Sequence, residues 1–476
     1  MLHIHRRLFY SLIIFCFLII YSDGAKHNKG LNKINRLKND NKYRLLQHRN
    51  SENLYLWKFY AIPKNYLLAK KGTILGIYLR QCFNRKNKNQ FYISSNNKSY
   101  YAQNDQFHTK LCEISKYKCL YYPHQSYFKV PHNIVSNLEE IEIVSKITGK
   151  KRTFHLDTTA ANSKPFDGIT VCTPLLYYYN NWLQMFMFLE KWREEKNVRI
   201  MIYYRSLSRD VFELLKYYEK LNIVYLIPSP IFPRNDPMQK FVATSGGMGP
   251  LFFNDCMYRN NANYLTVMDV DEYFHIFDEQ SRKKGLLEFV KKKANQYPMI
   301  GFFNFQSYYM SYINKKVDDS FNFATESLLT LDSMNIQGKS IMLTNKIYYP
   351  SYHIPLFKKE NDGYRFKKNE GILLHARPNY IFKNVESKDK IQFLGGPEKL
   401  KFNSEYRTLE KNLNKTLVFK YKHTVISDRC ILKNKKKSEN YCNWNIEECG
   451  KQIDLLENWI YTSEKSKNYQ EYVKLK

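Results

Sequence analysis

Three carboxylates follow a short apolar segment near the middle of this chain. Residues 264–268 are mostly apolar, and Asp269, Asp271 and Glu272 come directly after them. A continuous apolar run of this length predicts a buried strand of a parallel sheet. Because ligands of open α/β sheets lie beyond the carboxyl ends of the strands, these acids are predicted to face a ligand. Hard oxygen ligands there favour Mg²⁺ or Mn²⁺, which are often shared with substrate phosphates.

The spacing of the acids predicts where each one points. Side chains of an extended segment alternate, so Asp269 and Asp271 are predicted to share one side while Glu272 points to the other. Asp271 is therefore the first choice as a direct metal ligand, with Asp269 beside it. Glu272 is expected either to form a salt bridge, with Arg259 as a candidate partner, or to take part in catalysis. The alternative for the whole motif is an acidic turn that caps the next helix.

Predicted strands and helices alternate around these acids. Continuous apolar runs predict strands, and apolar residues three or four positions apart predict helices. This alternation is typical of the α/β class, with a mostly parallel sheet flanked by helices and connected by right-handed crossovers. The expected strands cover 169–174, 198–204, 223–227, 264–268 and 299–305, and the expected helices cover 181–193, 208–221, 251–261 and 284–295.

Composition divides the chain into five parts. Basic residues, an apolar run and small residues predict a signal peptide or an uncleaved signal-anchor at the N-terminus, although the run is short for a full membrane span. A basic stem or linker follows it, and short Tyr-rich runs then predict a smaller β-rich N-terminal domain. The region after 400 is basic and helix-prone. The predicted parts are 1–25, 26–50, 51–160, 165–430 for the α/β catalytic domain and 431–476 for a basic C-terminal extension.

The nine cysteines fit an oxidising compartment. Cys16 lies in the N-terminal apolar run, and the even number that remains predicts disulfides whose pairing the sequence leaves open. Cys172 is expected to be a free core thiol because it falls in a predicted buried strand. Cys256 is expected to be packed or disulfide-bonded. Sequons at Asn97 and Asn414 are compatible with glycosylation in a lumenal protein.

The formal net charge of +31 has no single focus. Lysines are spread through every segment, and no basic stripe with a known nucleic-acid module is present. Most of this charge is therefore assigned to solvated surface, and no nucleic-acid partner is predicted. A few basic residues are expected to line a site for a diphosphate.

Four short segments carry a resemblance to a known family. They are Val-Cys-Thr-Pro-Leu at 171–175, Asn-Asp-Cys-Met-Tyr-Arg at 254–259, the acidic segment at 269–272, and His-Ala-Arg at 375–377. With these segments in this order, the chain resembles glycosyltransferase family 92 over about 165–430. The family usually shows His-Tyr-Arg where this chain has His-Ala-Arg, so a contact from that tyrosine is not expected here.

The resemblance implies a GT-A-like fold and an inverting transfer of a hexose. The implied donor is a UDP-sugar, first UDP-galactose, with Mn²⁺ or Mg²⁺ as cofactor, and Asp269 would contact the ribose or the metal. The implied acceptor is a glycan on an N-glycan or glycoprotein. It also implies a Golgi membrane protein of type II topology with a lumenal catalytic domain, or a secreted protein if the N-terminal segment is cleaved. The alternative is a non-catalytic secreted protein that binds glycans or polyanions.

Further residues are assigned to the site. His375 is expected to complete the metal shell beside the two aspartates, with His353 as the second choice. Arg377 and Arg205 are expected to contact donor phosphates, and a structural salt bridge is the alternative for Arg377. Asp255 is expected to orient the site from behind the metal ligands.

An inverting transfer also needs a base. A carboxylate must take the proton of the acceptor hydroxyl as the new bond forms. Asp318, Asp319 and Glu326 follow the last predicted strand and are the candidates. The sequence does not choose among them.

Overall fold

The computed structural model divides the chain at the start of its first strand. Residues 1–53 and 54–476 are separate units, and all described residues belong to the second. The predicted N-terminal targeting segment and stem therefore lie outside the described residues. The structure describes residues 54–81, 91–95, 97–105, 121–233, 248–312, 327–333, 338–357, 361–376, 391–394, 411, 458–463, 466–467 and 470–475.

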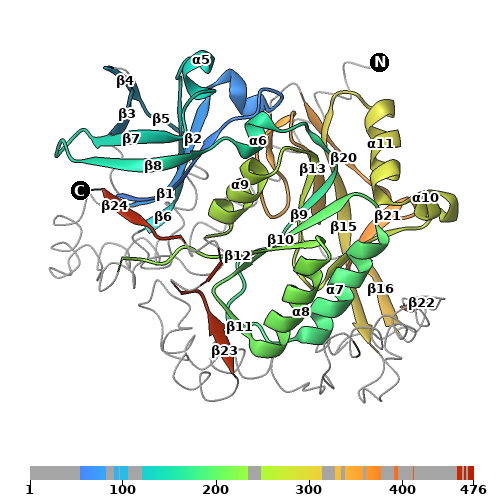
Figure 1. Cartoon of the computed structure of the whole chain (residues 1–476). Helices are drawn as coiled ribbons and strands as arrows, with labels where there is room; N and C mark the ends of the chain where they lie inside the picture. The colour runs from blue at the N-terminus through green and yellow to red at the C-terminus, as the bar shows by residue number, and fades with distance from the viewer. Residues whose placement is uncertain are drawn as a thin grey trace, which may run out of the picture. The chain divides into compact units, whose positions relative to one another are not determined.

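A nine-stranded sheet comes first in the chain (Figure 1, blue to teal). Its order is β4-β3-β7-β8-β1-β2-β6-β5, and β24 also pairs with β1. All eight residues of β1 are buried, as expected for a strand covered on both faces. The predicted β-rich N-terminal region is confirmed. The strands are β1 (Leu54–Ala61), β2 (Ile74–Gln81), β3 (Phe91–Ser95), β4 (Lys98–Tyr101), β5 (Gln103–Asp105), β6 (Tyr121–Phe128), β7 (Glu140–Ser145) and β8 (Lys151–Asp157), with short helices η1 (Leu67–Lys70), α5 (His132–Val135) and α6 (Thr159–Asn162).

An eleven-stranded sheet forms the α/β part. Its main order is β12-β10-β9-β13-β17-β15-β16-β22; β14 pairs with β21, and both β20 and β21 pair with β15. The strands β12, β10, β9 and β13 are parallel to one another, and β17 is antiparallel to β13 and β15. The α/β class is therefore confirmed, with a parallel first half and a mixed second half. The strands are β9 (Phe166–Cys172), β10 (Val198–Tyr204), β12 (Val224–Pro228), β13 (Ala262–Val267), β14 (Glu272–Ile276), β15 (Ile300–Tyr312), β16 (Ser327–Ser333), β17 (Lys339–Leu343), β20 (Asp362–Arg365), β21 (Gly371–Ala376) and β22 (Ile391–Leu394).

The helices connect the parallel strands at the positions that apolar spacing predicts. α7 (Trp182–Glu194) follows β9, and α8 (Arg209–Lys220) follows β10; the two helices lie side by side in Figure 1. Both begin at a side-chain cap, since Asn181 accepts from the amide of Gln184 and Ser208 accepts from that of Val211. The helix expected at 284–295 is α11 (Leu286–Gln296), and a short helix α10 (Glu279–Lys284) precedes it; Gly285, with a φ of 93°, separates the two.

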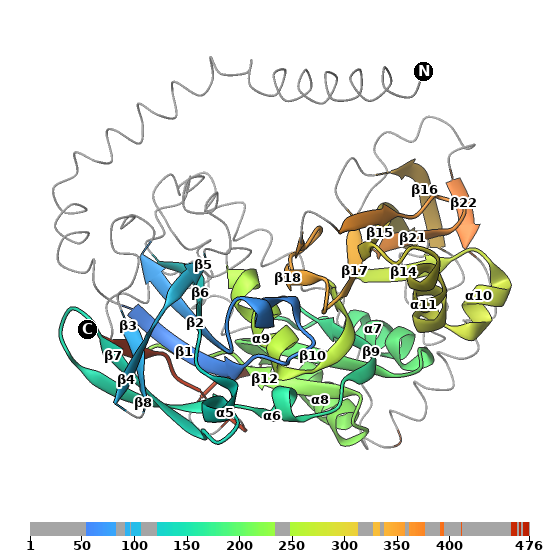
Figure 2. The same ribbon diagram turned by 90° about the horizontal axis from the view of Figure 1, so that it is seen from above.

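Helix α9 (Gly249–Arg259) lies between the two sheets. It contacts β9 and β13 of the α/β sheet and also β2 and β6 of the N-terminal sheet. Residues on all sides of it are buried, which explains its near-continuous apolar sequence. The helix that precedes the acidic strand is therefore also the element that joins the two sheets (Figure 2).

The described residues of the C-terminal extension include two short strands, and most of the region after 400, predicted to be helix-prone, lies outside the described residues. β23 (Trp459–Tyr461) pairs with β11 (Ser206–Ser208), and β24 (Val473–Leu475) pairs with β1. A two-stranded sheet is formed by β18 (Ile347–Tyr349) and β19 (Leu356–Phe357). Within the described ranges, every helix is too short or too polar to span a lipid bilayer.

Candidate active site

The acidic segment forms a turn at the carboxyl end of β13. The strand ends at Val267, and the amide of Glu272 donates to the carbonyl of Asp269 at 3.1 Å, which reverses the chain into β14. The amide of Asp269 also donates to Glu272 Oε2 at 3.1 Å. The expectation that Glu272 points away from the aspartates is therefore wrong. It rested on an extended segment, and the turn brings Glu272 back beside Asp269.

A buried lysine that the sequence analysis did not assign holds these acids. Lys339 opens β17, and its Nζ lies 2.7 Å from Asp269 Oδ2 and 3.2 Å from Glu272 Oε2. The side chain of Lys339 is 2% exposed and that of Glu272 is 5% exposed, whereas that of Asp269 is 40% exposed. The partner of Glu272 is thus Lys339, and the suggested pair with Arg259 is wrong.

Asp271 and His375 form the second half of the site. The antiparallel pairing of β14 and β21 places His375 directly opposite Glu272. As a result, His375 Nε2 lies 3.1 Å from Asp271 Oδ2, and His375 Nδ1 lies 3.8 Å from Glu272 Oε1. His353, the second choice for this position, has its Nδ1 3.0 Å from the carbonyl oxygen of Gly338. The structure therefore brings His375 to the acidic turn.

Asp269, Glu272 and Lys339 shift one another's pKa values. Burial alone would raise the pKa of Asp269, but the adjacent Lys339 ammonium holds it below its usual range. Burial would lower the pKa of Lys339, and Asp269 and Glu272 raise it instead, so the lysine is charged. Burial raises the pKa of Glu272 to about 7; Lys339 opposes this rise and Asp269 adds to it. The charge of Lys339 therefore offsets the repulsion between the neighbouring carboxylates of Asp269 and Glu272.

Asp255 lies in a separate and fully buried cluster. It is 0% exposed, and Arg259 donates to both of its oxygens at 2.9–3.0 Å. Tyr203 of β10 donates to Oδ2 at 2.5 Å, and Tyr60 of β1 donates to Oδ1. Burial would raise the pKa of Asp255, but the charges of Arg259 and Lys58 hold it below its usual range. These contacts join β1, β10 and α9, so Asp255 ties the two sheets together.

A disulfide lies beside the carboxyl end of the acidic strand β13. Cys172, the last residue of β9, is bonded to Cys256 of α9, with the two Cα atoms 6.0 Å apart. The expectation of a free thiol at Cys172 is therefore wrong, because α9 packs against β9 and brings Cys256 beside the end of the strand. Cys172 also accepts a 3.0 Å hydrogen bond from the amide of Met268, so the bond lies directly behind the acidic turn.

The sequence of this chain also matches a known protein family. The family model described as glycosyltransferase family 92 matches residues 167–417, more than half of the chain. The chain belongs to glycosyltransferase family 92. It is therefore a glycosyltransferase, and the acidic turn, His375 and Lys339 lie inside the region that the family model matches.

Solved structures that resemble this chain do so only distantly. The S. aureus protein TarS (residues 1–349) is 11% identical, with a TM-score of 0.26, over 60% of this chain and 91% of its own. Its complex with UDP gives 11% identity and a TM-score of 0.27 over the same shares. At these scores the likeness supports no conclusion about this chain. A comparison with curated protein sequences gave no match.

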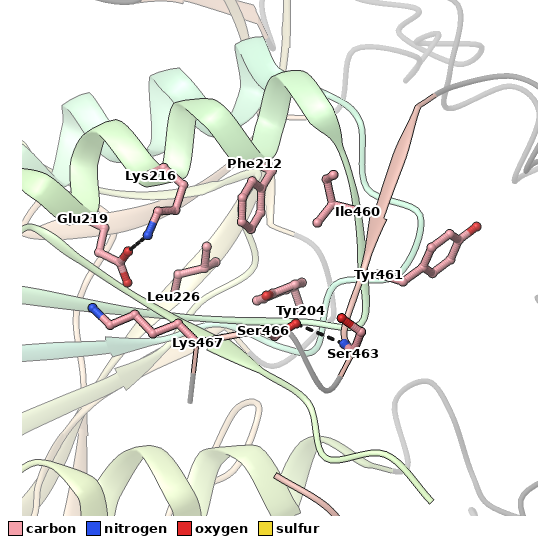
Figure 3. Close-up of a pocket in the computed structure, with 10 residues that line it drawn as sticks. All are labelled: Tyr204, Phe212, Lys216, Glu219, Leu226, Ile460, Tyr461, Ser463, Ser466 and Lys467. Carbon is pink, nitrogen blue, oxygen red and sulfur yellow. Dashed lines mark hydrogen bonds and ion pairs between the residues drawn. The ribbon is translucent and has the colours of Figure 1, made fainter. Parts of the chain in front are cut away.

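Arg205 of this family 92 protein contacts the C-terminal segment. Its Nη1 donates to Thr462 Oγ1 at 2.8 Å, and the amide of Thr462 donates back to the carbonyl of Arg205. A side pocket of about 250 Å³ lies next to this contact, between α8, β12 and the segment around β23 (Figure 3). Tyr204 and Phe212 are among its lining residues, and none of the predicted site residues is. The phosphate role of Arg205 stays a prediction.

Four predicted residues lie outside the described part of the chain. Arg377 follows the end of β21, and the candidate bases Asp318, Asp319 and Glu326 fall between β15 and β16. Their expected roles in the family 92 site therefore stay predictions.

The residues present fit a divalent ion that the donor helps to hold. Among the described residues, no group of three His, Cys, Asp or Glu side chains is placed to bind a metal. Asp271 Oδ2 and His375 Nε2, however, are 3.1 Å apart. Neighbouring ligands of an octahedral ion with bonds of about 2.1 Å lie about 3.0 Å apart. Two protein ligands plus phosphate oxygens and water is the usual arrangement for such an ion in a phosphate-binding site.

Proposed function

We propose that this enzyme transfers a hexose from a UDP-sugar to a glycan, with inversion and with the help of Mn²⁺ or Mg²⁺. Galactose from UDP-galactose is the first donor to test, and an N-glycan or glycoprotein is the acceptor class. The single observation that carries the metal-dependent part is the Asp271–His375 pair, whose donor atoms are 3.1 Å apart at the end of β13. Family 92 membership supports the transfer reaction itself.

Asp271 and His375 would hold the ion on the side of the donor diphosphate. A divalent ion bound there would neutralise the charge that develops on the departing UDP. The side chain of Asp271 is 21% exposed and that of His375 is 10% exposed, so both are accessible but not freely solvated. Restricted access of water strengthens an ionic contact at such a site.

Asp269 would have a different role from Asp271. One of its oxygens is paired with Lys339, yet its side chain is 40% exposed. A carboxylate in this state can accept hydrogen bonds from the hydroxyls of a ribose while its charge is already balanced. We therefore assign Asp269 to the nucleoside part of the donor, and Asp271 to the metal.

The same proposal includes the Golgi lumen as the place of action, with the N-terminal segment as an anchor or a cleaved signal. The Cys172–Cys256 disulfide supports it, because such bonds persist in oxidising compartments. Asn97 of the first sequon is exposed in the turn between β3 and β4, where a glycan can be attached.

A donor screen with the full-length protein tests this function. UDP-galactose, UDP-glucose, UDP-N-acetylglucosamine and UDP-N-acetylgalactosamine are each incubated with a glycan acceptor and Mn²⁺, and released UDP and product are measured. We expect transfer from one donor, loss of it in EDTA, and loss of at least a hundredfold in Asp271→Ala. Asp362→Asn, at an exposed acid of β20, is the matched control and should retain activity. If EDTA and the Asp271→Ala substitution both leave the activity at the wild-type level, the metal-dependent mechanism is overturned. NMR of the product tests inversion.

A further inference from the structure

The position of Lys339 is unusual for a lysine. Its side chain is 2% exposed, and among the described residues Lys58 is the other lysine that is buried. Removing an ammonium from water costs several kcal/mol unless opposite charges and hydrogen bonds compensate it. Here the compensation comes from Asp269 at 2.7 Å and Glu272 at 3.2 Å. Lys339 is thus a fixed positive charge inside the acidic turn.

The surrounding backbone holds this charge in place. Gly338 packs so closely on β15 that a Cβ atom there would lie 1.7 Å from the carbonyl oxygen of Phe305. On the other side of Lys339, Ser340 Oγ accepts from the side-chain Nδ2 of Asn304 at 3.0 Å and donates to the carbonyl of His353 at 2.5 Å. The ammonium is also 5.5 Å from the centre of the Tyr352 ring. Lys339 therefore has little freedom to leave the carboxylates.

This fixed charge divides the acidic residues into two groups. Asp269 and Glu272 are paired with Lys339, whereas Asp271 is paired with His375. A divalent ion that approached Asp269 would meet the ammonium 2.7 Å from the carboxylate oxygen. Repulsion between two cations at such distances amounts to several kcal/mol in a partly buried site. Among the described residues of the acidic turn and β21, this leaves Asp271 and His375 as the pair of protein ligands farthest from the ammonium's own partners.

We propose that Lys339 is a positioning residue that occupies Asp269 and Glu272, so that the metal binds weakly alone and tightly only with the donor diphosphate. This inference rests on the proposed metal-dependent function. Two protein ligands hold a divalent ion weakly, and phosphate oxygens supply the missing ligands and negative charge. Lys339 therefore makes metal and donor bind cooperatively, and each raises the affinity of the other by the same factor.

The test measures Mn²⁺ binding to the full-length protein by electron paramagnetic resonance, with and without UDP. In Lys339→Met, Asp269 is released to act as a ligand. We expect donor-free Mn²⁺ to bind at least about tenfold more tightly than in the wild type, and the gain on adding UDP to shrink. Lys339→Arg keeps the charge and should stay close to the wild type. Lys58→Met, which breaks the buried Lys58–Asp157 pair of the N-terminal sheet, should lower stability and leave Mn²⁺ affinity unchanged.

A folded Lys339→Met protein with unchanged or weaker donor-free Mn²⁺ binding would overturn the inference. If Lys339→Met does not fold, the charge-matched variant Lys339→Met/Glu272→Gln is used, with the same expected tightening. Failure of both variants to fold would assign Lys339 to stability alone and would also count against the inference. If the wild type binds Mn²⁺ but turns over no UDP-sugar, the proposed function fails while the affinity ratio still tests Lys339.

Discussion

Two acidic sites in this molecule are built in opposite ways. Asp255 is fully buried and receives Arg259 on both oxygens, with Tyr203 and Tyr60 as further donors. At the end of β13, Asp269 and Glu272 share one ammonium and Asp271 lies beside His375, and the two aspartates are 40% and 21% exposed. In the first site, the charge of the carboxylate is matched by its partners and the site is closed to solvent. The second has an excess of negative charge that faces outward.

The difference separates an acid that stabilises the fold from acids that can bind a ligand. A buried carboxylate whose partners are complete has nothing left to offer a substrate or ion. An acidic cluster with more carboxylates than cations attracts a cation, and its perturbed protonation is typical of functional sites. The two sites lie at opposite ends of the short path from α9 through the Cys172–Cys256 bond to the acidic turn.

Arg259→Met should have the largest effect on stability. It leaves Asp255 charged and buried, so we expect the free energy of unfolding to fall by about 3–5 kcal/mol, measured by denaturant unfolding. Lys283→Met, which breaks an exposed pair with Glu279, should change it by less than about 1 kcal/mol. Mn²⁺ affinity should be unchanged in Arg259→Met. A loss of metal binding without a loss of stability would show that the Asp255 cluster belongs to the active site after all.

Removal of the disulfide tests the connection between the two sites. The bond closes a loop of 84 positions, and its loss in Cys172→Ser/Cys256→Ser should lower the free energy of unfolding by about 2–4 kcal/mol. Reducing buffer should lower the stability of the wild type by at least this amount, and the double variant should lose less stability on reduction than the wild type does. Equal stability of the wild type with and without reductant contradicts this prediction.

His375→Ala tests the open site on its own. The loss of one of two protein ligands should raise the Mn²⁺ concentration for half-maximal activity by about 10–100-fold, with little change in unfolding. His353→Ala is the matched control, since its ring lies beside the carbonyl of Gly338. If His353→Ala has the larger effect on the Mn²⁺ requirement, the assignment of the ligands is reversed.

The pH dependence of stability should show the most gradual effect, because it is spread over more than two pH units. The pKa of Glu272 is raised to about 7 in the folded protein, against an ordinary value of 4.5. The folded state therefore holds an extra proton between these values, and stability should fall as pH rises from 4.5 to 7, by at most about 1.4 kcal/mol per unit. The measurement uses EDTA, and Glu272→Gln should flatten the slope. A slope that is unchanged in Glu272→Gln would assign it to another group.

The strands and helices could be predicted from the sequence more accurately than the contacts between them. The strands that become β9, β10, β12 and β13 and the helices α7 and α8 follow from local apolar spacing, and the structure has them near the expected bounds. Local spacing also placed the acids at the end of a strand. It could not show Lys339, because the antiparallel pairing that brings β17 beside β13 joins residues more than seventy positions apart.

Two errors have the same physical origin. The turn at 269–272 depends on where the chain reverses, and the Cys172–Cys256 bond depends on which face of α9 meets β9. Asp255 looked like an orienting residue because the sequence places it shortly before the acidic strand. Its partners Tyr60 and Tyr203 come from two different sheets, so only the folded structure shows what it does.

The pairing of β24 with β1 has a consequence for how this protein is made. Trp57 Nε1 donates to Gln470 Oε1 at 2.6 Å, across 413 positions of sequence. During synthesis, the edge of β1 at Leu54–Leu56 stays without this partner until Val473–Leu475 have left the ribosome. Contacts over such separations form slowly, and a waiting strand edge can pair with another chain. The yield of the folded enzyme is therefore expected to depend on whether this edge of β1 is protected from other chains during that interval.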